Sequence, residues 1–328
     1  MSSIVISVDA MGGDDAPGVV LEGVAEALAA DTDLEVVLVG PEDIVGDFCR
    51  THDRCEPCVA TEVIGMGEHP ANAVRVKKDS SIVVGCRLVK EGRADGFFSA
   101  GSTGACLAAA VRVIGRIKGV RRPALTTIIP SPEKPVVMAD VGANADCKPE
   151  YLVQFAQMAV IYARRIIHIA DPRVALLNIG SEPTKGSQFY QETHELLRAQ
   201  VPEFAGNGEG NDIIPGAYDV FVCDGFTGNV ALKTIEGTSK QLFKSLKGVM
   251  TANLLNALAA AVLKGSLRGF ASRLSADTYG GAPLLGVRGA VIVGHGSSSP
   301  LAIKNGILTT AACVREDVCG LIEKAVQA

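Results

Sequence analysis

Three polar side chains of this sequence combine a reactive group with a glycine-rich setting. Lys185 precedes Gly186 in NIGSEPTKG, and His295 stands between two glycines in VIVGHGSS. Asn229 closes the loop DGFTGN, which begins at Asp224. A lysine in such a loop at the start of a helix can neutralise a phosphate, because glycine lets the backbone approach the anion closely. Each residue also has a structural alternative: a solvated lysine, a histidine that only hydrogen-bonds the backbone, and an asparagine that caps the following helix.

Six glycine-bearing loops follow short apolar segments of the sequence. In an open parallel sheet the loops after the strands lie at the carboxyl edge, where ligands bind. Free backbone N–H groups and helix dipoles at such an edge favour an anion. The sequence therefore predicts one composite anion-binding site from residues 9–13, 99–104, 140–144, 178–186, 224–229 and 294–298. The residues expected to bind phosphate or substrate are Asp9, Gly12, Gly13, Gly101, Ser102, Thr103, Gly104, Gly142, Asn144, Gly186, Gly296 and Ser297.

The segments between these loops predict the architecture that must position them. Apolar runs such as LEVVLVG, KPVVMADVG and RVALLNIG alternate with helical patterns such as PEYLVQFAQMAVIYARR. This alternation predicts βαβ units, and hence a mostly parallel sheet covered by helices on both faces. No repeat or linker divides the 328 residues, so we expect one α/β domain over residues 1–328.

The composition argues against several classes of protein. A net charge of −5 does not suit general nucleic-acid binding. No signal pattern precedes the first predicted strand, and the apolar stretch 248–263 is shorter than the roughly 20 residues of a membrane span, so we expect a cytoplasmic protein. Neither a dinucleotide fingerprint nor a P-loop occurs in its standard order.

The nine cysteines are odd in number and scattered through apolar segments, which favours reduced thiols. The one compact pair, Cys55 and Cys58, has no second pair or histidines at zinc-ligand spacing. We therefore expect neither a metal nor a cofactor. Cys147 and Cys223 lie in glycine-rich loops and are the plausible nucleophiles among the nine.

A basic segment stands out against the negative total charge. Residues 237–276 contain six Lys or Arg and no Asp or Glu, with apolar stripes on both sides of Gly265. This pattern predicts a protruding helical hairpin over about residues 245–276, broken at Gly265. Basic flanks suit docking to anionic lipid or to an acidic carrier protein through Lys264, Arg268 and Arg273. A hairpin that packs in a core or a dimer interface is the alternative.

Eight stretches together closely resemble the bacterial phosphate acyltransferases of phospholipid synthesis. They are VDAMGGDDAP, VKKDSSIVVGCRLVKEGRADGFFSAGSTGA, GRIKGVRRPAL, DVGANADCKPEYLVQFA, RVALLNIGSEPTKG, CDGFTGNVALKTIEG, YGGAPLLG and HGSSSPLAIKN. The resemblance implies a Rossmann-like three-layer α/β/α sandwich, like isocitrate dehydrogenases and phosphotransacetylases, and a homodimer. It also implies that the enzyme makes acyl phosphate from fatty acyl-[acyl carrier protein] and inorganic phosphate. The product would pass to a membrane glycerol-3-phosphate acyltransferase.

This reaction needs no protein nucleophile, because phosphate is already anionic and a thiolate leaves readily. The site must position phosphate and stabilise the oxyanion, and we expect Lys185, Asp224, Asn229 and His295 to do so. The sequence departs from the family at Ser102, where Asn is usual, and at Gly65, where an acidic residue is usual. The alternative functions are a non-catalytic scaffold that binds acyl carrier protein and an NAD-dependent dehydrogenase on a related fold.

Overall fold

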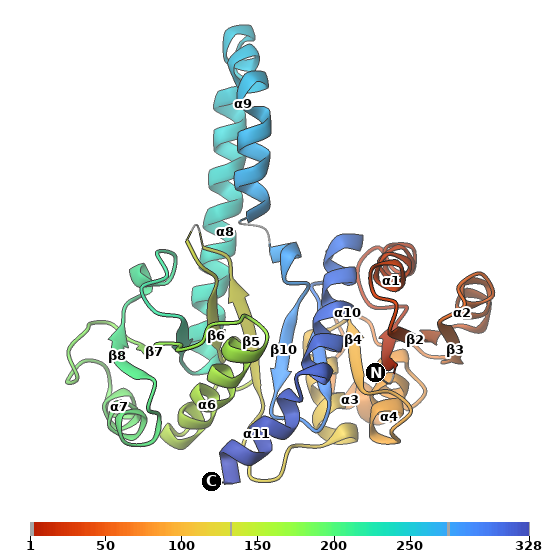
Figure 1. Ribbon diagram of the computed structural model, residues 1–328, viewed down its shortest axis with the longest axis horizontal. Coiled ribbons are helices and arrows are strands. Elements are labelled where there is room, and N and C mark those ends of the chain that lie inside the picture. Colours follow the sequence, from red (N-terminus) through yellow and green to blue (C-terminus); the bar gives the residue numbers. More distant parts are fainter. Residues whose placement is uncertain (1–2, 132, 274–275, 328) are drawn as a thin grey trace.

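The computed structural model describes residues 3–131, 133–273 and 276–327, and its core is one eleven-stranded sheet (Figure 1). The strands are β1 (Ile4–Asp9), β2 (Leu34–Gly40), β3 (Cys55–Val59), β4 (Gly96–Ser99), β5 (Ala124–Ile129), β6 (Val136–Ala139), β7 (Val174–Leu177), β8 (Phe204–Gly208), β9 (Val220–Val222), β10 (Ala282–Leu285) and β11 (Ala290–Val293). The helices are α1 (Gly18–Ala30), α2 (Glu42–Cys49), α3 (Pro70–Val76), α4 (Ser81–Lys90), α5 (Thr103–Ala109), α6 (Pro149–Arg165), α7 (Gln188–Gln200), α8 (Gly225–Met250), α9 (Leu254–Arg273), α10 (Pro300–Arg315) and α11 (Val318–Gln327).

The strand order is β3-β2-β1-β4-β11-β10-β5-β6-β9-β7-β8, and seven of its ten strand pairs are parallel. The predicted α/β fold with a mostly parallel sheet is therefore confirmed. Three neighbouring pairs in the middle are antiparallel, namely β11–β10, β10–β5 and β5–β6. Each antiparallel pair reverses the direction once, so β6, β7, β8 and β9 run opposite to β1, β2, β3, β4 and β11.

This reversal corrects the expectation that six glycine-bearing loops share one edge of the sheet. The loops after β1, β4 and β11 lie at one carboxyl edge, and those after β6, β7 and β9 lie at the other. The sequence pattern could not reveal the reversal, because an antiparallel pair in the middle of a sheet has the same buried, apolar strands as a parallel one.

Helices cover both faces of the sheet, as the alternation predicts. On one face α1, α2, α6, α7, α10 and α11 share a continuous core with the strands. On the other face α3, α4 and α5 cover one half of the sheet and α8 covers the other half. Along β2, Val36 and Leu38 point into the first core whereas Val37 and Val39 point into the second, which explains why these strands are apolar throughout.

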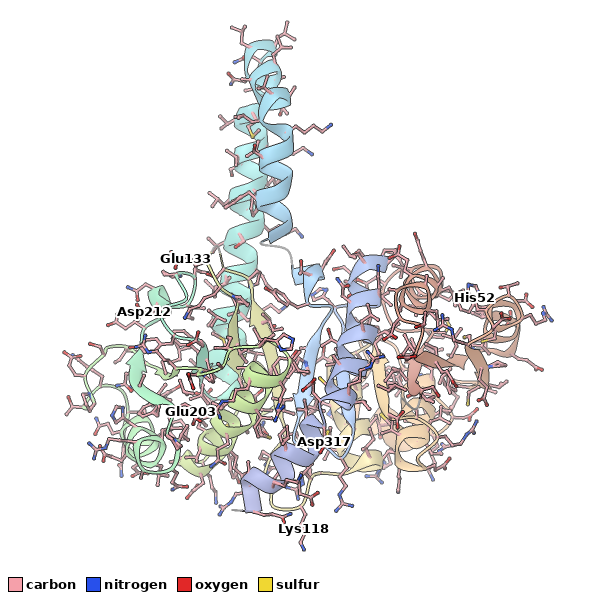
Figure 2. The ribbon with its side chains drawn as sticks, in the orientation of Figure 1. His52, Lys118, Glu133, Glu203, Asp212 and Asp317 are labelled. Atoms are coloured by element: carbon pink, nitrogen blue, oxygen red, sulfur yellow. The ribbon has the colours of Figure 1, made fainter. Side chains whose placement is uncertain are left out.

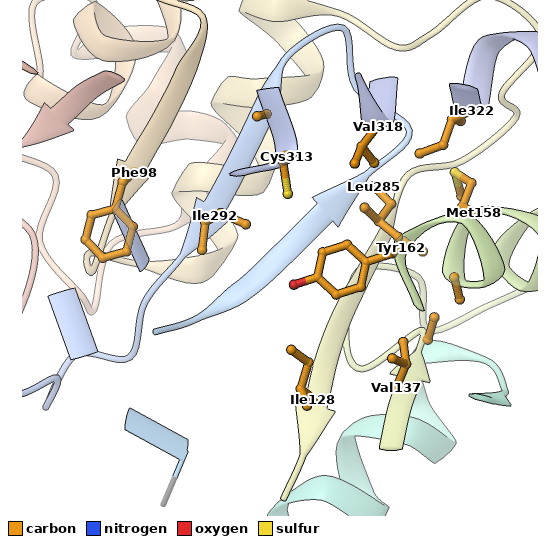
Figure 3. Packing of buried hydrophobic residues seen from close by; sticks show 14 of the residues in the cluster. Phe98, Ile128, Val137, Met158, Tyr162, Leu285, Ile292, Cys313, Val318 and Ile322 are labelled. Carbon is orange, nitrogen blue, oxygen red and sulfur yellow. The ribbon is translucent and has the colours of Figure 1, made fainter. Parts of the chain in front are cut away.

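Figure 3 shows the centre of the larger core, where Tyr162 of α6 lies among Ile128, Leu285 and Cys313. These residues belong to α6, β5, β10 and α10, which lie far apart in the sequence. The strands at which the sheet reverses direction are therefore joined by one well-packed core.

The protruding hairpin is present, but its boundaries differ from the expected ones. Its arms are α8, with 26 residues, and α9, with 20 residues, and both project from the body in Figure 1. The turn comes at residues 251–253, where the Asn253 side chain accepts a hydrogen bond from the N–H of Asn256. The predicted break at Gly265 is wrong, because α9 continues through it; one glycine costs a helix only about 1 kcal/mol. Residues 274–275, at the end of the predicted hairpin, lie outside the described residues.

The described helices differ widely in length, and a helix that spans a bilayer needs roughly 20 predominantly apolar residues. None of them, the long arms of the hairpin included, is both long and apolar enough to cross a bilayer.

Candidate functional site

The loop after β6 is organised by Asp140, which is fully buried at the end of the strand. Its Oδ1 accepts hydrogen bonds from the backbone N–H groups of Leu125, Gly142 and Ala143, at 3.0–3.1 Å. Its Oδ2 accepts from both the backbone N–H and the side-chain amide of Asn144, each at 2.8 Å. Burial raises the pKa of Asp140, and these donors oppose the rise. The Asp140 carboxylate thus fixes the backbone conformation of residues 140–144.

The start of α8 packs against this loop and carries a second carboxylate. The Gly225 N–H donates to the Asn144 carbonyl at 2.8 Å, and a Cβ at Gly228 would lie 1.9 Å from the Asp140 carbonyl oxygen. Glycine is therefore required at position 228 for this close approach. Asn229 lies in the second turn of α8, where its amide donates to the Val141 carbonyl at 3.0 Å. The interpretation of Asn229 as an N-cap is wrong, because α8 begins earlier, at Gly225.

Asp224 is the actual N-cap of α8. Its Oδ1 accepts from the Thr227 N–H at 2.9 Å. Its Oδ2 accepts from the Tyr190 hydroxyl at 2.6 Å and from the Thr227 hydroxyl at 2.8 Å. Burial, followed by the hydrogen bond to Asp224, raises the pKa of Tyr190, so its phenol stays protonated as a donor. Tyr190 therefore ties α7 to the start of α8.

Tyr190 also connects this site to the loop that carries Lys185. A Cβ at Gly186, whose φ is +85°, would lie 2.8 Å from the Tyr190 Cβ and 2.8 Å from the Asn178 Oδ1. The Asn178 side chain in turn donates to the Lys185 carbonyl at 3.3 Å. The Lys185 side chain is half exposed, and its Nζ lies 3.9 Å from a carboxylate oxygen of Glu182. The backbone of Lys185 is therefore fixed by a hydrogen bond, while its ammonium group remains accessible to solvent.

An open cavity of about 490 Å³ lies beside Asp224. Its lining residues are Ala145, Asp146, Cys147, Phe189, Asp224, Phe226 and Thr227. The volume is in the usual range for ligand pockets, roughly 300–1,000 Å³. Burial raises the pKa of Cys147 to about 12, and it also raises the pKa of the fully buried Cys223. Neither thiol is thus an activated nucleophile at neutral pH. We call Asp140, Asn144, Asp224, Tyr190 and Lys185, with this cavity, the Asp140 site.

The loops after β1 and β4 form a second cluster around Asp9. The Asp9 Oδ2 accepts from the Ser99 hydroxyl at 2.7 Å, and its Oδ1 accepts from the Met11 N–H at 3.0 Å. Burial raises the pKa of Asp9, and the hydrogen bonds oppose the rise. A Cβ at Gly12 would lie 2.7 Å from the Gly101 nitrogen, so the two glycine loops touch backbone to backbone.

The loop after β11 completes this second cluster. The Asp14 N–H donates to the Gly296 carbonyl at 2.7 Å, and Gly13, with φ +120°, lies against the same carbonyl. His295 is exposed, and its Nδ1 accepts from the Ser297 N–H at 3.2 Å. We call these residues, with the loop 101–104, the Asp9 cluster.

The expected site residues therefore divide into two groups. Lys185, Gly186, Gly142, Asn144, Asp224 and Asn229 gather at the Asp140 site, and the remaining expected residues outside the hairpin gather in the Asp9 cluster. Asp140, Ser99 and Tyr190 were not among the individual site residues expected from the sequence. Asp140 could have been found by analogy, because VVMAD ends in an aspartate as VISVD does.

The three basic residues expected to dock a lipid or a carrier lie along α9. Lys264 is exposed, and the side chains of Arg268 and Arg273 lie outside the described part of the structure. Among the described residues, no group of three or more His, Cys, Asp or Glu side chains is arranged to hold a metal ion.

Comparison with known proteins places most of the chain in one family. A family model described as "Fatty acid synthesis protein" matches residues 4–321. A curated phosphate acyltransferase of Desulfitobacterium hafniense (strain Y51) is 49% identical over 323 residues, which are 97% of this chain and 95% of that protein. A phosphate acyltransferase of Bacillus pumilus is 45% identical over 98% of this chain and 97% of its own length.

Two solved structures share the fold. A phosphotransacetylase from Streptococcus pyogenes superposes with a TM-score of 0.62 at 20% identity, over 96% of this chain and 94% of its own. A branched-chain phosphotransacylase from Enterococcus faecalis gives a TM-score of 0.58 at 14% identity, over 95% of this chain and 99% of its own. The phosphotransacetylase-like architecture expected from the sequence is thereby confirmed.

Proposed function

This chain belongs to the phosphate acyltransferases, enzymes that transfer an acyl group to phosphate, and we propose that its acyl donor is a fatty acyl thioester of acyl carrier protein. The observation that carries the proposal is the family match, which spans residues 4–321 and is described as fatty acid synthesis. The open cavity beside Asp224, with the rings of Phe189 and Phe226 in its wall, supports a partly apolar substrate of this kind.

In the proposed reaction, Lys185 holds inorganic phosphate at the Asp140 site. A phosphate oxygen attacks the thioester carbonyl, the new C–O bond forms, and the C–S bond then breaks to release the carrier's thiolate. Lys185 positions the phosphate beside the thioester, and positioning is the main contribution that such a displacement requires. Asp140 and Asn229 act on the shape of the loop, because their hydrogen bonds are made to backbone groups of residues 141–144.

Direct attack by phosphate leaves no acyl group on the enzyme. The raised pKa values of Cys147 and Cys223 support this mechanism, because thiols in that state are poor nucleophiles. Cys147→Ala and Cys223→Ala enzymes should retain turnover, and intact-protein mass spectrometry should detect no acylated enzyme. A stable acyl adduct on the wild-type protein would contradict direct attack.

The test of the function is the consumption of acyl carrier thioester with and without phosphate, with acyl phosphate detected by mass spectrometry. We expect loss of thioester only when phosphate is present, with an equal amount of acyl phosphate formed. Carrier binding without thioester loss would instead indicate the non-catalytic scaffold. Binding of NAD with no acyl phosphate would indicate the dehydrogenase.

The hairpin supports a second part of the proposal, a peripheral contact with an anionic membrane. Leu254, Leu255 and Val262 are 76–86% exposed, and the exposed Lys247 and Lys264 flank them. Anionic lipids attract each Lys or Arg near the surface by about 1 kcal/mol. Such a location suits an enzyme that hands acyl phosphate to a membrane glycerol-3-phosphate acyltransferase.

Charge reversal of Lys264, Arg268 and Arg273 to Glu tests the membrane contact. Co-sedimentation with vesicles that contain anionic phospholipid should be lost, and binding by the wild type should weaken as salt is added.

We also propose a homodimer. A variant that still binds vesicles but dissociates into monomers would assign the hairpin to the dimer interface instead.

A further inference from the structure

A second basic surface lies on the body of the protein, away from the hairpin. It consists of Arg116, Lys118, Arg121, Arg122 and Arg288, all exposed, and we call it the basic patch. Four of these residues come from a segment, residues 96–132, that contains no Asp or Glu. In a chain with a net charge of −5, such a segment concentrates positive charge on one surface.

Hydrogen bonds hold the residues of the basic patch together. The Arg116 guanidinium donates to the carbonyls of Val120 and Arg121, which folds the segment 116–122 into a compact loop. The Arg288 Nε donates to the Arg116 carbonyl at 3.0 Å, which places the loop before β11 beside it. The patch is therefore a defined surface with five cations.

The five cations of the patch have carbonyl and aromatic neighbours among the described residues. None of the five forms an ion pair with a described residue. The Arg122 guanidinium lies 6.0 Å from the centre of the Tyr151 ring, and the end of α11 reaches the patch through the Gln327 amide, which donates to the Lys118 carbonyl. The nearby acidic side chain on α11, Glu323, accepts from Gln327. In the part of the chain that the structure describes, the patch thus presents positive charge to solvent without a paired carboxylate.

The patch adjoins the wall of the Asp140 site. Pro123 follows Arg122, and its carbonyl accepts from the Asn144 side chain at 2.8 Å. The next residues after Asn144, Ala145 to Cys147, line the cavity beside Asp224. A protein seated on the patch would therefore stand next to the cavity, where a flexible arm that carries a thioester can enter.

We propose that the basic patch is the docking surface for the acidic carrier protein that delivers the acyl thioester. This inference rests on the carrier thioester being the substrate, as proposed above. It assigns carrier docking to the basic patch and membrane binding to the hairpin, whereas both were considered for the hairpin on sequence grounds. Lys118 and the tip of the hairpin lie at opposite ends of the molecule (Figure 2), so one compact partner would not cover both. Complementary charge of this kind chiefly raises the rate of encounter and makes it sensitive to salt.

The test compares the triple variant Lys118→Glu, Arg121→Glu, Arg122→Glu with wild type on two substrates. With the acyl carrier thioester at low salt, we expect KM to rise at least tenfold. With a carrier-free thioester of the same acyl chain, such as acyl pantetheine, we expect kcat/KM within twofold of wild type. Added salt should raise the wild-type KM for the carrier and leave that of the variant nearly unchanged.

The matched control reverses three exposed cations elsewhere, Arg75, Lys78 and Lys90, with the same change in charge. An equal rise in carrier KM for this control, or an unchanged KM for the folded patch variant, would overturn the docking surface. If the triple variant does not fold, as judged by its melting transition, the single changes Lys118→Ala and Arg121→Ala serve the same comparison. Failure of the wild type to form acyl phosphate from the carrier thioester would overturn the proposed function instead.

Discussion

Asp9 and Asp140 both end a buried strand and are themselves buried, yet the loops that they organise have different surroundings. Asp140 accepts five hydrogen bonds, four of them from backbone N–H groups. Asp9 instead has the side chains of Ser99 and Ser81 as hydrogen-bond partners, together with the backbone N–H of Met11. Beside Asp140 lie a cavity, the Tyr190–Asp224 pair and the Lys185 loop. The same local pattern thus builds two loops, and the different neighbouring elements are the reason that we propose phosphate binding at the Asp140 site.

The largest expected difference between the two regions is in stability. Asp140→Ala leaves several buried donors without an acceptor, each at about 1–3 kcal/mol, and we expect the free energy of unfolding to fall by at least about 3 kcal/mol. Asp9→Ala loses fewer hydrogen bonds, and two of its partners are serine hydroxyls that can rotate to other acceptors, so the change should cost clearly less. Thermal unfolding of both variants checks this order, and an equal or larger loss for Asp9→Ala would contradict the different roles of the two carboxylates.

Lys185→Ala should change the dependence of the reaction on phosphate. We expect the KM for phosphate to rise tenfold or more, which corresponds to about 1.4 kcal/mol, because the ammonium no longer offsets the charge of the anion. The KM for the acyl carrier thioester should stay within about twofold of wild type. Lys90→Ala, on the opposite half of the sheet, is the control. An unchanged phosphate KM would remove Lys185 from the site.

A smaller effect is expected in the pH dependence of stability at Asp9. In the folded protein, burial raises the pKa of the Asp9 carboxyl group above its ordinary value of 3.8. The folded state therefore binds this proton more tightly than the unfolded state does. Stability from this group is therefore lost as the pH rises from about 4 to the raised pKa, by at most ~1.4 kcal/mol per pH unit. Asp9→Asn cannot ionise, so its free energy of unfolding relative to wild type should increase across this range. A relative decrease, measured by urea unfolding at each pH, would show that the Asp9 carboxylate is stabilising.

The smallest effect is expected at His295. Its ring lies in the Asp9 cluster and its Nδ1 is occupied by the Ser297 N–H, so His295→Ala should leave the KM for phosphate within about twofold of wild type. Steady-state kinetics in parallel with Lys185→Ala make the comparison direct. A rise in phosphate KM as large as that of Lys185→Ala would mean that the two regions serve one phosphate site.

The sequence predicted the α/β fold because alternating apolar and helical segments depend only on local patterns. It also predicted that loops such as 9–13 and 140–144 belong to a binding site, since a glycine-rich turn with an aspartate after a strand can be recognised from neighbouring residues alone. The direction of β6, β7 and β9 relative to β1 was not predictable, because it depends on how β5 and β10 pair across the centre of the sheet. Tyr190 was missed for a similar reason, since its hydroxyl meets Asp224 only in the folded chain.

The boundaries of the hairpin show that helix propensity alone does not locate a helix end. Glycine at position 265 predicts a break, but α9 continues through it, and the chain turns at residues 251–253 instead. The Asn256 N–H donates to the Asn253 side chain, and the Asn256 amide donates to the Val249 carbonyl. Local hydrogen bonds thus mark the turn, while the basic, acid-free composition correctly indicated that the segment is exposed.

We propose that inorganic phosphate binds at the Asp140 site and not at the Asp9 cluster. Hydrogen exchange of the full-length protein, followed by mass spectrometry with and without phosphate, tests this claim without requiring turnover. We expect phosphate to slow exchange in the peptides that cover residues 178–187 and 140–147 and to leave exchange in residues 9–14 and 294–298 unchanged. Protection confined to residues 9–14, 99–104 and 294–298 would contradict it.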